Sequence, residues 1–323
     1  MRRKILLTNH YEGVLYDLLN DGKDERFSIK MLDQVNKSEL IKEIEDADYL
    51  LVSGKLEIDK DVIRCARKLK MVQRTGVGID RIDLDTLKEC DIPLYVNSGV
   101  NARSVAEYTI MLMLSCLRRQ SVVFRQMNEC VWKKQENGIL SHELYGKKVG
   151  IVGMGNIGRR VAEILKAFQC HVLYYDKYRQ NIDVEDELNI HFTDYNELIK
   201  ESDIISLHCS YSSADGYIIK KEQIDQMKEG VIIINTARGK LIDENALFNG
   251  LSSHKIACCG LDTFEKEPLS TESPLREMDN VILSPHIAGL TYESYEVMIK
   301  NALSNIKDYN DGNLDRISHL RVV

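Results

Sequence analysis

Three apolar runs in the last third of the sequence each lead into side chains that can do chemistry: Arg238 after residues 232–237, Asp262 and Glu267 after 258–261, and His286 after 281–285. If these runs are parallel strands, their carboxyl ends meet at one edge of a sheet, where ligands bind. A guanidinium would then converge with carboxylates and an imidazole. That set suits reduction of a 2-keto acid, because arginine can hold the carboxylate and polarise the carbonyl while histidine supplies a proton.

A carboxylate beside His286 would stabilise the charged imidazolium, and Glu267 is our candidate for that task. Glu265 lies two residues earlier and offers the same chemical group. The residues alone leave the choice between the two glutamates open.

A glycine-rich turn predicts a dinucleotide site in the middle of the chain. Val149–Val152 leads into Gly153-Met154-Gly155-Asn156-Ile157-Gly158, and a helix-like stretch and a second apolar run end at Asp176. Gly153 allows the sharp turn, Gly155 lets the backbone approach a pyrophosphate, and Gly158 lets the helix pack on the strand, while Asn156 and Ile157 begin that helix beside the phosphates. Asp176 would accept hydrogen bonds from the ribose hydroxyls and would repel a 2'-phosphate, so we predict NAD as the cofactor.

Short apolar runs alternate with helical patterns along the whole chain, which is typical of parallel sheets covered by helices. The expected strands are 4–8, 49–53, 71–75, 94–97, 149–152, 171–175, 204–208, 231–235, 255–261 and 281–284. The glycine turn lies in mid-chain, so a doubly wound domain must precede the cofactor domain, and residues 104–116 would form the helix that crosses between them. The predicted fold class is α/β, with two doubly wound parallel-sheet domains.

Composition excludes several classes of function. The net charge of −7 with interspersed charges offers no basic face for nucleic acid. No apolar run approaches membrane-spanning length, and the first residues resemble a strand more than a signal peptide, so we expect a soluble, cytoplasmic protein. The eight cysteines form no C-x-x-C pair and the eight histidines no metal motif, so we expect reduced thiols and no metal site. Cys258 and Cys259 should face opposite sides of their strand.

Taken in order, these motifs resemble those of the D-isomer-specific 2-hydroxyacid dehydrogenases, a family that includes phosphoglycerate dehydrogenase and glyoxylate/hydroxypyruvate reductase. The matching segments are Gly76–Asp80, Ser104–Glu107, the Gly153 turn, Asn235–Gly239, Leu261–Pro268 and Ser284–His286. The resemblance implies that Arg238, Glu267 and His286 are catalytic, since the family places its acid next to the proline. It implies that Asp262 binds the nicotinamide carboxamide. It also implies a Rossmann NAD-binding domain at 99–288, inserted into a flavodoxin-like substrate domain at 1–98 plus 289–323, with the reaction in the cleft between them.

The same resemblance assigns contacts outside this catalytic set. Backbone amides around Ser53-Gly54-Lys55 and Gly76-Val77-Gly78 should hold the substrate carboxylate, and Lys55 or Arg81 could add charge for a phosphorylated substrate. Four residues after predicted strands should lie beside the cofactor: His208, Cys209, Thr236 and Ala237. His208 is equally compatible with a purely structural role. The segment between Arg118 and Gly146, which contains Trp132, resembles the family's dimer arm and predicts a homodimer through the NAD-binding domain.

Two loops depart from the family pattern. His208-Cys209-Ser210-Tyr211 and Asn97-Ser98-Gly99 lack prolines that many members carry, which could loosen the cofactor and hinge loops. We expect a dehydrogenase of small D-2-hydroxy acids, possible substrates being 3-phosphoglycerate and hydroxypyruvate or glyoxylate. The alternative is an NAD(H)-sensing binding protein that resembles the family's corepressor branch. Formate dehydrogenase is disfavoured, because Glu267 stands where formate enzymes carry a neutral amide.

Overall fold

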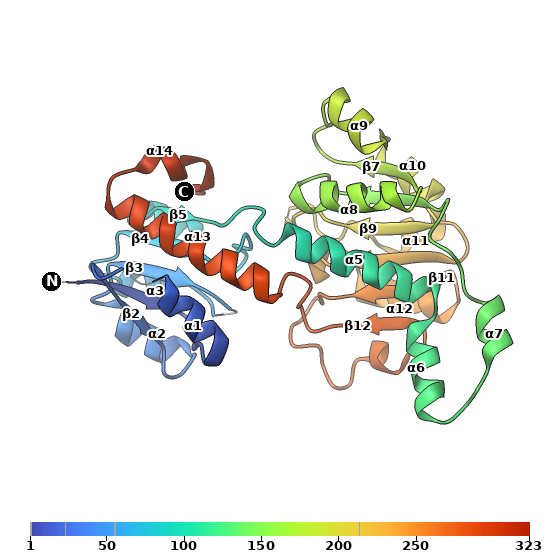
Figure 1. Ribbon diagram of the computed structural model, residues 1–323, viewed down its shortest axis with the longest axis horizontal. Helices are drawn as coiled ribbons and strands as arrows, with labels where there is room; N and C mark the ends of the chain where they lie inside the picture. Colours follow the sequence, from blue (N-terminus) through green and yellow to red (C-terminus); the bar gives the residue numbers. More distant parts are fainter. Residues whose placement is uncertain (1, 23, 55, 213) are drawn as a thin grey trace. The chain divides into compact units, whose positions relative to one another are not determined.

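The computed structural model describes residues 2–22, 24–54, 56–212 and 214–323. The chain divides into two compact units, one made of residues 1–101 and 291–323 and the other of residues 102–290 (Figure 1). The sequence predicted one domain made of residues 1–98 and 289–323 and another made of residues 99–288. Both ends of the chain therefore belong to the first unit, and the second unit is a single continuous segment.

The first unit is built on a five-stranded sheet in the order β2-β1-β3-β4-β5. All its strand pairs are parallel: β1 (Arg3–Leu7), β2 (Phe27–Met31), β3 (Tyr49–Val52), β4 (Met71–Arg74) and β5 (Leu94–Tyr95). This is the flavodoxin-like strand order, whose switch point lies between β1 and β3. The helices are α1 (Gly13–Asp21), α2 (Lys37–Ile44), α3 (Lys60–Cys65), α4 (Leu84–Glu89), α13 (Tyr292–Asn310) and α14 (Leu314–Ile317).

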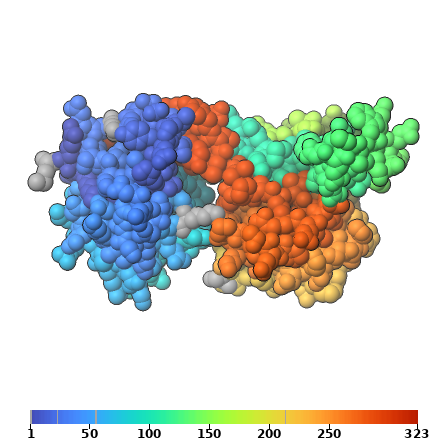
Figure 2. Space-filling model, turned by 90° about the horizontal axis from the view of Figure 1, so that it is seen from below, coloured from blue at the N-terminus to red at the C-terminus, as the bar shows by residue number. Residues whose placement is uncertain are grey.

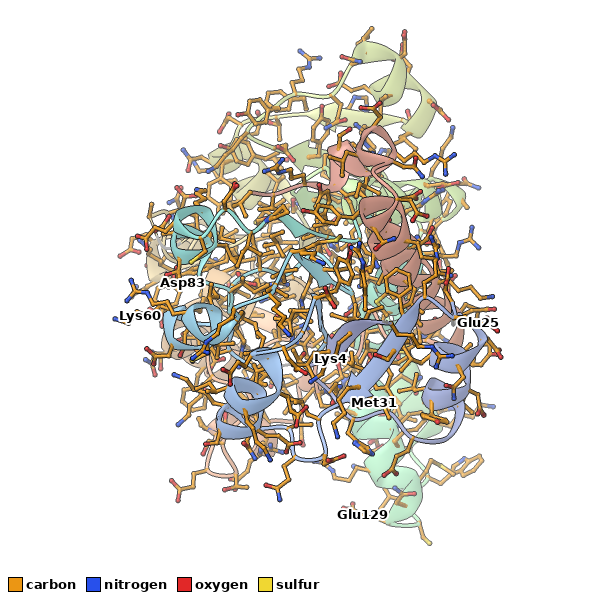
Figure 3. The ribbon with its side chains drawn as sticks, turned by 90° about the vertical axis from the view of Figure 1, so that its left-hand side faces the viewer. Lys4, Glu25, Met31, Lys60, Asp83 and Glu129 are labelled. Carbon is orange, nitrogen blue, oxygen red and sulfur yellow. The ribbon has the colours of Figure 1, made fainter. Side chains whose placement is uncertain are left out.

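Successive residues of β3 enter different apolar clusters, because side chains alternate across a strand. Leu50 packs with Leu6 and Val72 on one face, and Leu51 packs with Leu7 and Met71 on the other. Both faces of the sheet are therefore buried, as a doubly wound fold requires. Lys4 and Asp83, both labelled in Figure 3, are charged side chains that stay partly exposed: Lys4 pairs with Glu43 and Asp46, and Asp83 caps α4.

The second unit is built on a seven-stranded parallel sheet in the order β12-β11-β10-β9-β6-β7-β8. Its strands are β6 (Lys148–Val152), β7 (His171–Tyr175), β8 (Ile190–Phe192), β9 (Ile204–Leu207), β10 (Val231–Asn235), β11 (Ile256–Leu261) and β12 (Val281–Leu283). This is the Rossmann order, and it reverses between β6 and β9. The helices are α5 (Ala102–Leu117), α6 (Gln120–Asn128), α7 (Lys134–Ile139), α8 (Asn156–Ala167), α9 (Ile182–Leu188), α10 (Tyr195–Glu201), α11 (Lys221–Gln226) and α12 (Glu244–Ser252).

These two sheets confirm the predicted fold class. Cys258 lies in the apolar cluster on one face of the second sheet and Cys259 in the cluster on the other, also as predicted. Two strands, β2 and β8, were not predicted. Each is an edge strand, with polar residues among its apolar ones, so neither shows the continuous apolar run of a central strand.

Candidate active site

The glycine turn lies at the switch point of the second sheet, directly after β6. Gly153 has a φ of +99°, and a Cβ there would lie 2.5 Å from the backbone nitrogen of Cys209. A Cβ on Gly158 would lie 2.2 Å from the carbonyl oxygen of Gly153. A Cβ on Gly155 would meet nothing within 4 Å. The first and third glycines therefore allow close packing, while the second leaves open space at the N-terminus of α8 for a pyrophosphate.

Asp176 follows β7 and holds the same turn. Its carboxylate accepts hydrogen bonds from the backbone amides of Met154, at 2.7 Å, and Tyr178, at 3.1 Å. The side chain of Gln180 donates to the carbonyl oxygen of Met154 at 3.2 Å, so both backbone polar groups of Met154 are held. A carboxylate has about four acceptor positions, which leaves capacity for ribose hydroxyls. Together with the open space at Gly155, this donor and acceptor set fits NAD.

The first two residues of α8 have different surroundings. Asn156 is exposed, and Ile157 is half-buried and packs against the apolar cluster beneath the helix. Their proposed contacts with the phosphates therefore rest on the helix N-terminus rather than on a side-chain pocket.

His208 and Cys209 follow β9 beside the glycine turn. The backbone amide of His208 donates to the carbonyl oxygen of Val152 at 2.8 Å, and the ring Nε2 pairs with the Ser206 hydroxyl at 2.8 Å. Nδ1 is buried and has no partner among the described residues. Burial lowers the pKa of His208 to about 3 and raises the pKa of the Cys209 thiol to about 11. Both side chains are therefore neutral at physiological pH.

Arg238 lies in a loop that Asn235 organises. The Asn235 side chain accepts a hydrogen bond from the Ala237 amide at 3.0 Å and donates to the carbonyl oxygen of Arg238 at 2.9 Å. The hydroxyl of Thr236 pairs with that of Thr109 on α5 at 3.0 Å. The Arg238 guanidinium is half-buried and donates to the Ala237 carbonyl at 2.8 Å. Asn235 belongs to the motif quoted above, but its side chain was given no role there.

Gly239 brings the Arg238 loop against the loop that carries the glutamates. A Cβ on Gly239 would lie 1.8 Å from the carbonyl carbon of Phe264, so only glycine permits this approach. Glu265 is occupied by other partners: it accepts from the Glu244 amide at 2.9 Å and from the Tyr217 hydroxyl at 2.9 Å. The carboxylate left to face the imidazole is that of Glu267.

Glu267 and His286 form a close pair. The imidazole Nδ1 lies 3.0 Å and 2.9 Å from the two carboxylate oxygens of Glu267. Because a carboxylate can only accept, Nδ1 must carry a proton, and Nε2 is then the ring atom open to proton exchange. The His286 side chain is 40% exposed and that of Glu267 is 13% exposed, so the imidazole reaches solvent while its partner is mostly covered.

Asp262 is completely buried and holds the His286 loop. Its carboxylate accepts hydrogen bonds from the Ser284 hydroxyl at 2.6 Å and from the amides of Ile287 and Ala288 at 2.9 Å and 2.8 Å. His286 itself has a φ of +60°, a left-handed conformation that such anchoring can maintain. The predicted contact with a carboxamide stays a prediction, because in this conformation the carboxylate has no exposed surface.

The residues predicted to hold the substrate carboxylate lie in the first unit. The Ser53 amide is already donated to the Thr8 hydroxyl at 2.9 Å, so Ser53 has no free amide for a ligand. Gly54 is exposed with a φ of +77°, and Val77 is 43% exposed. A Cβ on Gly76 would meet nothing within 4 Å. Lys55 lies outside the described residues.

Sequence reasoning missed Arg74 in this part of the first unit. Its guanidinium donates to the carbonyl oxygens of Gly78, at 3.0 Å, and Val52, at 3.1 Å. Arg74 thereby joins the Gly76–Gly78 loop to the end of β3. Its place directly before that loop, at the end of an apolar run, was the available signal.

None of the helices in the described part of the chain has the length and apolar character needed to cross a membrane. No group of three or more His, Cys, Asp or Glu side chains in this part of the chain is placed to hold a metal ion.

Comparisons with known proteins agree with this geometry. Residues 110–288 match the family model described as D-isomer specific 2-hydroxyacid dehydrogenase, NAD binding domain. The chain is 39% identical over 264 residues to a hydroxypyruvate reductase of Thermotoga maritima, covering 81% of this chain and 84% of the relative. It is 37% identical over 313 residues to a D-3-phosphoglycerate dehydrogenase of Methanocaldococcus jannaschii, covering 96% of this chain but only 58% of that protein. The chain thus spans little more than half of this longer relative.

A solved structure extends the likeness to nearly the whole chain. The D-lactate dehydrogenase of Aquifex aeolicus, crystallised with NAD and lactic acid, superimposes with a TM-score of 0.87 at 31% identity and covers 99% of each chain. The family model matches more than half of the residues, and the Thermotoga relative is covered over most of its length. The chain therefore belongs to the D-isomer specific 2-hydroxyacid dehydrogenases, and its residues 110–288 match the family's NAD-binding domain.

Proposed function

We propose that this protein is an NAD-dependent dehydrogenase that interconverts a small D-2-hydroxy acid and its 2-keto acid. The observation that carries the proposal is the Glu267–His286 pair, with Nδ1 held within 3.0 Å of the carboxylate and Nε2 left for a substrate oxygen. When bound, NAD(H) supplies the hydride acceptor or donor for C2 of the substrate.

His286 is the proton donor and acceptor in this proposal. In the reductive direction Nε2 gives its proton to the carbonyl oxygen of the keto acid, and in the oxidative direction it takes the hydroxyl proton. Glu267 fixes the ring orientation through Nδ1 and stabilises the imidazolium form. Asp262 keeps the His286 loop in place through three hydrogen bonds.

Arg238 is the cation that would hold the substrate carboxylate and polarise the neighbouring carbonyl. Its loop is fixed by Asn235 from within and by Gly239 packing against Phe264. A guanidinium can pair with a planar carboxylate through two parallel hydrogen bonds, which orients the keto acid. We further propose that Gly54 and the Gly76–Gly78 loop of the first unit offer backbone amides to a substrate carboxylate.

Three-phosphoglycerate and hydroxypyruvate or glyoxylate are the substrates that we put first. Relatives at 34–39% identity are named for these acids, whereas two solved neighbours named for lactate are 26% and 31% identical. Arg81, a cation near the Gly76–Gly78 loop in the sequence, is a candidate for phosphate recognition. Steady-state rates with glyoxylate, hydroxypyruvate, pyruvate and phosphohydroxypyruvate would rank the substrates.

The decisive variant is His286→Asn. Asparagine tolerates the left-handed backbone at this position better than alanine, so the loop should keep its shape. Loss of the acid–base group should lower kcat by about 100- to 10,000-fold. Binding of NADH, followed by fluorescence titration, should reach its midpoint at the same NADH concentration as in the wild type. His171→Asn, at an exposed histidine at the start of β7, is the matched control.

Two results would contradict the proposal. Unchanged turnover in His286→Asn would exclude the imidazole as proton donor. Binding of NADH without oxidation by any 2-keto acid of the panel would favour the NAD(H)-sensing alternative instead.

We also infer that the protein forms a homodimer through an arm of the second unit, residues 118–146, which contains α6 and α7. In Figure 2 the arm (green) stands out from the surface of the second unit. It exposes large apolar side chains, with Trp132 77% exposed and Ile139 82% exposed, and such patches are typical of protein interfaces. Light scattering should give the mass of a dimer for the wild type, and Trp132→Glu with Ile139→Glu should give the mass of a monomer. A wild-type monomer would refute the inference.

A further inference from the structure

Two cysteines from different elements of the second unit face each other in its core. Cys116 lies in the last turn of α5 and Cys258 lies on β11, and they are 4% and 7% exposed. Both belong to the apolar cluster on the α5 face of the sheet. Neither takes part in the proposed chemistry.

The packing of α5 on β11 sets the distance between them. A Cβ on Gly260 would lie 2.9 Å from the Cβ of Leu112, so helix and strand touch at this point. Cys116 lies one helical turn beyond Leu112, about 6 Å along the axis, and Cys258 lies two residues before Gly260, about 6.6 Å along the strand. Residues four apart on a helix lie on the same face, and so do residues two apart on a strand, so Cys116 shares the face of Leu112 and Cys258 shares the face of Gly260.

The path from Leu112 to Cys116 and the path from Gly260 to Cys258 also run in the same direction in space. Thr109 of α5 contacts Thr236, just beyond the carboxyl end of β10, so α5 runs antiparallel to the strands. Moving toward the end of α5 therefore means moving back along β11, which brings Cys116 opposite Cys258. The neighbouring Cys258 thiol, together with burial, raises the pKa of the Cys116 thiol. A disulfide needs a Cβ–Cβ separation of about 3.5–4.5 Å, and this register places the two cysteines on the facing sides of α5 and β11.

A cavity borders this pair. It has a volume of about 860 Å³ and is lined by both cysteines together with the first residues of β9 and β10, Ile204 and Val231. It therefore lies at the amino edge of the sheet. Asp262 is four residues beyond Cys258, about 13 Å along the strand direction, so the pair is remote from the candidate active site.

We propose that Cys116 and Cys258 form a reversible disulfide when the protein meets a low-molecular-weight disulfide. One thiol loses its proton and its sulfur attacks the small disulfide, which forms a mixed disulfide and releases one small thiolate. The second cysteine then loses its proton and attacks the sulfur bound to the protein, which closes the Cys116–Cys258 bond and releases the second thiolate. The two protein thiols give up two electrons, the small disulfide takes them up, and the two protons go to the released thiolates.

The disulfide would be a covalent cross-link between α5 and β11 of the sheet. It would join residues that are far apart in the chain, and such cross-links restrict the unfolded state most. The last turn of α5 leads directly into the arm, residues 118–146. In oxidising conditions the disulfide would therefore hold the start of the arm against the sheet. Reduction would release it.

The test uses the full chain and 2-hydroxyethyl disulfide as the oxidant. After incubation, free thiols are alkylated and peptides are mapped by mass spectrometry without reduction. We expect a linked pair of peptides that contain Cys116 and Cys258, with a rise of roughly 5–10 °C in the unfolding midpoint that dithiothreitol reverses. Cys116→Ser and Cys258→Ser should each lose the link. Cys259→Ser, at the buried neighbour on the other face of β11, is the matched control and should keep it.

Each alternative outcome overturns the proposal. A small-molecule adduct that persists on Cys116 or Cys258 without closure would show that the thiols do not reach each other. Adducts confined to the exposed Cys90 and Cys130 would show that the cavity gives no access. The readout is a mass and a melting midpoint, so it does not depend on whether the proposed dehydrogenase activity is found.

Discussion

Asp262→Asn tests whether the buried carboxylate anchors the loop that carries His286, the proposed proton donor. The amide oxygen of asparagine can keep two of the three donors, those of Ser284 and Ile287, but its NH2 group would then face the amide of Ala288. One buried N–H is left unsatisfied, at a cost of about 1–3 kcal/mol, and two charge-assisted hydrogen bonds become ordinary ones. The total loss should be about 3 kcal/mol.

The loss should appear in both stability and turnover. For a unit of this size, about 3 kcal/mol corresponds to a fall of roughly 6–12 °C in the unfolding midpoint, measured by circular dichroism. His286 would no longer be held at a φ of +60°, and a displacement of about 1 Å at a catalytic group can lower kcat about 100-fold. Asp225→Asn makes the same chemical change on an exposed helix and should alter neither quantity.

The opposite pattern would refute this reasoning. If the main partner of Asp262 is a bound carboxamide, Asp262→Asn should weaken NADH binding while the unfolding midpoint and the loop remain unchanged. Fluorescence titration with NADH separates the two cases, because the anchoring role predicts nearly wild-type affinity.

Three other substitutions test the surroundings of the site. The folded-state pKa of His208, about 3, lies below the ordinary value near 6.5, so the unfolded state binds more protons between these pH values. Stability should therefore fall by at most about 1.4 kcal/mol per pH unit below pH 6.5, and urea unfolding at pH 7 and pH 5 should show a weaker decline in His208→Gln; equal declines would contradict the assignment. Gly239→Ala should lose about 1–3 kcal/mol and most turnover, because its Cβ would overlap Phe264, whereas Gly138→Ala, where nothing lies within 4 Å, should be harmless in the same melting and rate assays. Asp176→Ser should raise kcat/KM for NADPH relative to NADH about tenfold or more, since the carboxylate no longer repels a 2'-phosphate, and an unchanged ratio would show that specificity lies elsewhere.

The central strands could be predicted from the sequence because most of their residues are apolar and β-forming. Residues 172–175 and 231–234 are runs of β-forming residues, and the strands in the structure extend each run by one residue, to 171–175 and 231–235. Edge strands lack this signal. β8 has three residues, and only the first of them is buried, so nothing in its composition distinguishes it from a loop.

The residues of the candidate site also differ in how far their roles depend on neighbours in the sequence. The packing demands on Gly153 and Gly158 arise within one strand, turn and helix, so their spacing alone indicates them. The partners of Asp262 and Ser53 lie far along the chain or in another loop, and their hydrogen bonds depend on the path of the backbone after each strand. Likewise, the residues could not decide between Glu265 and Glu267, because the partners that occupy Glu265 come from segments more than 20 residues away.

The order of strands in the second sheet has a consequence for how activity can be lost. The glycine turn follows β6, which has neighbours on both sides, whereas His286 follows β12, a strand of three residues at the sheet margin, paired on one side only. Marginal strands open locally at a lower free-energy cost than central ones. Gentle heating or mild denaturant should therefore open β12, which leads to the proposed proton donor His286, before the central strands. Protein in this partly open state should still bind NADH but show no turnover, and amide hydrogen exchange should be faster near Val281 than in β6.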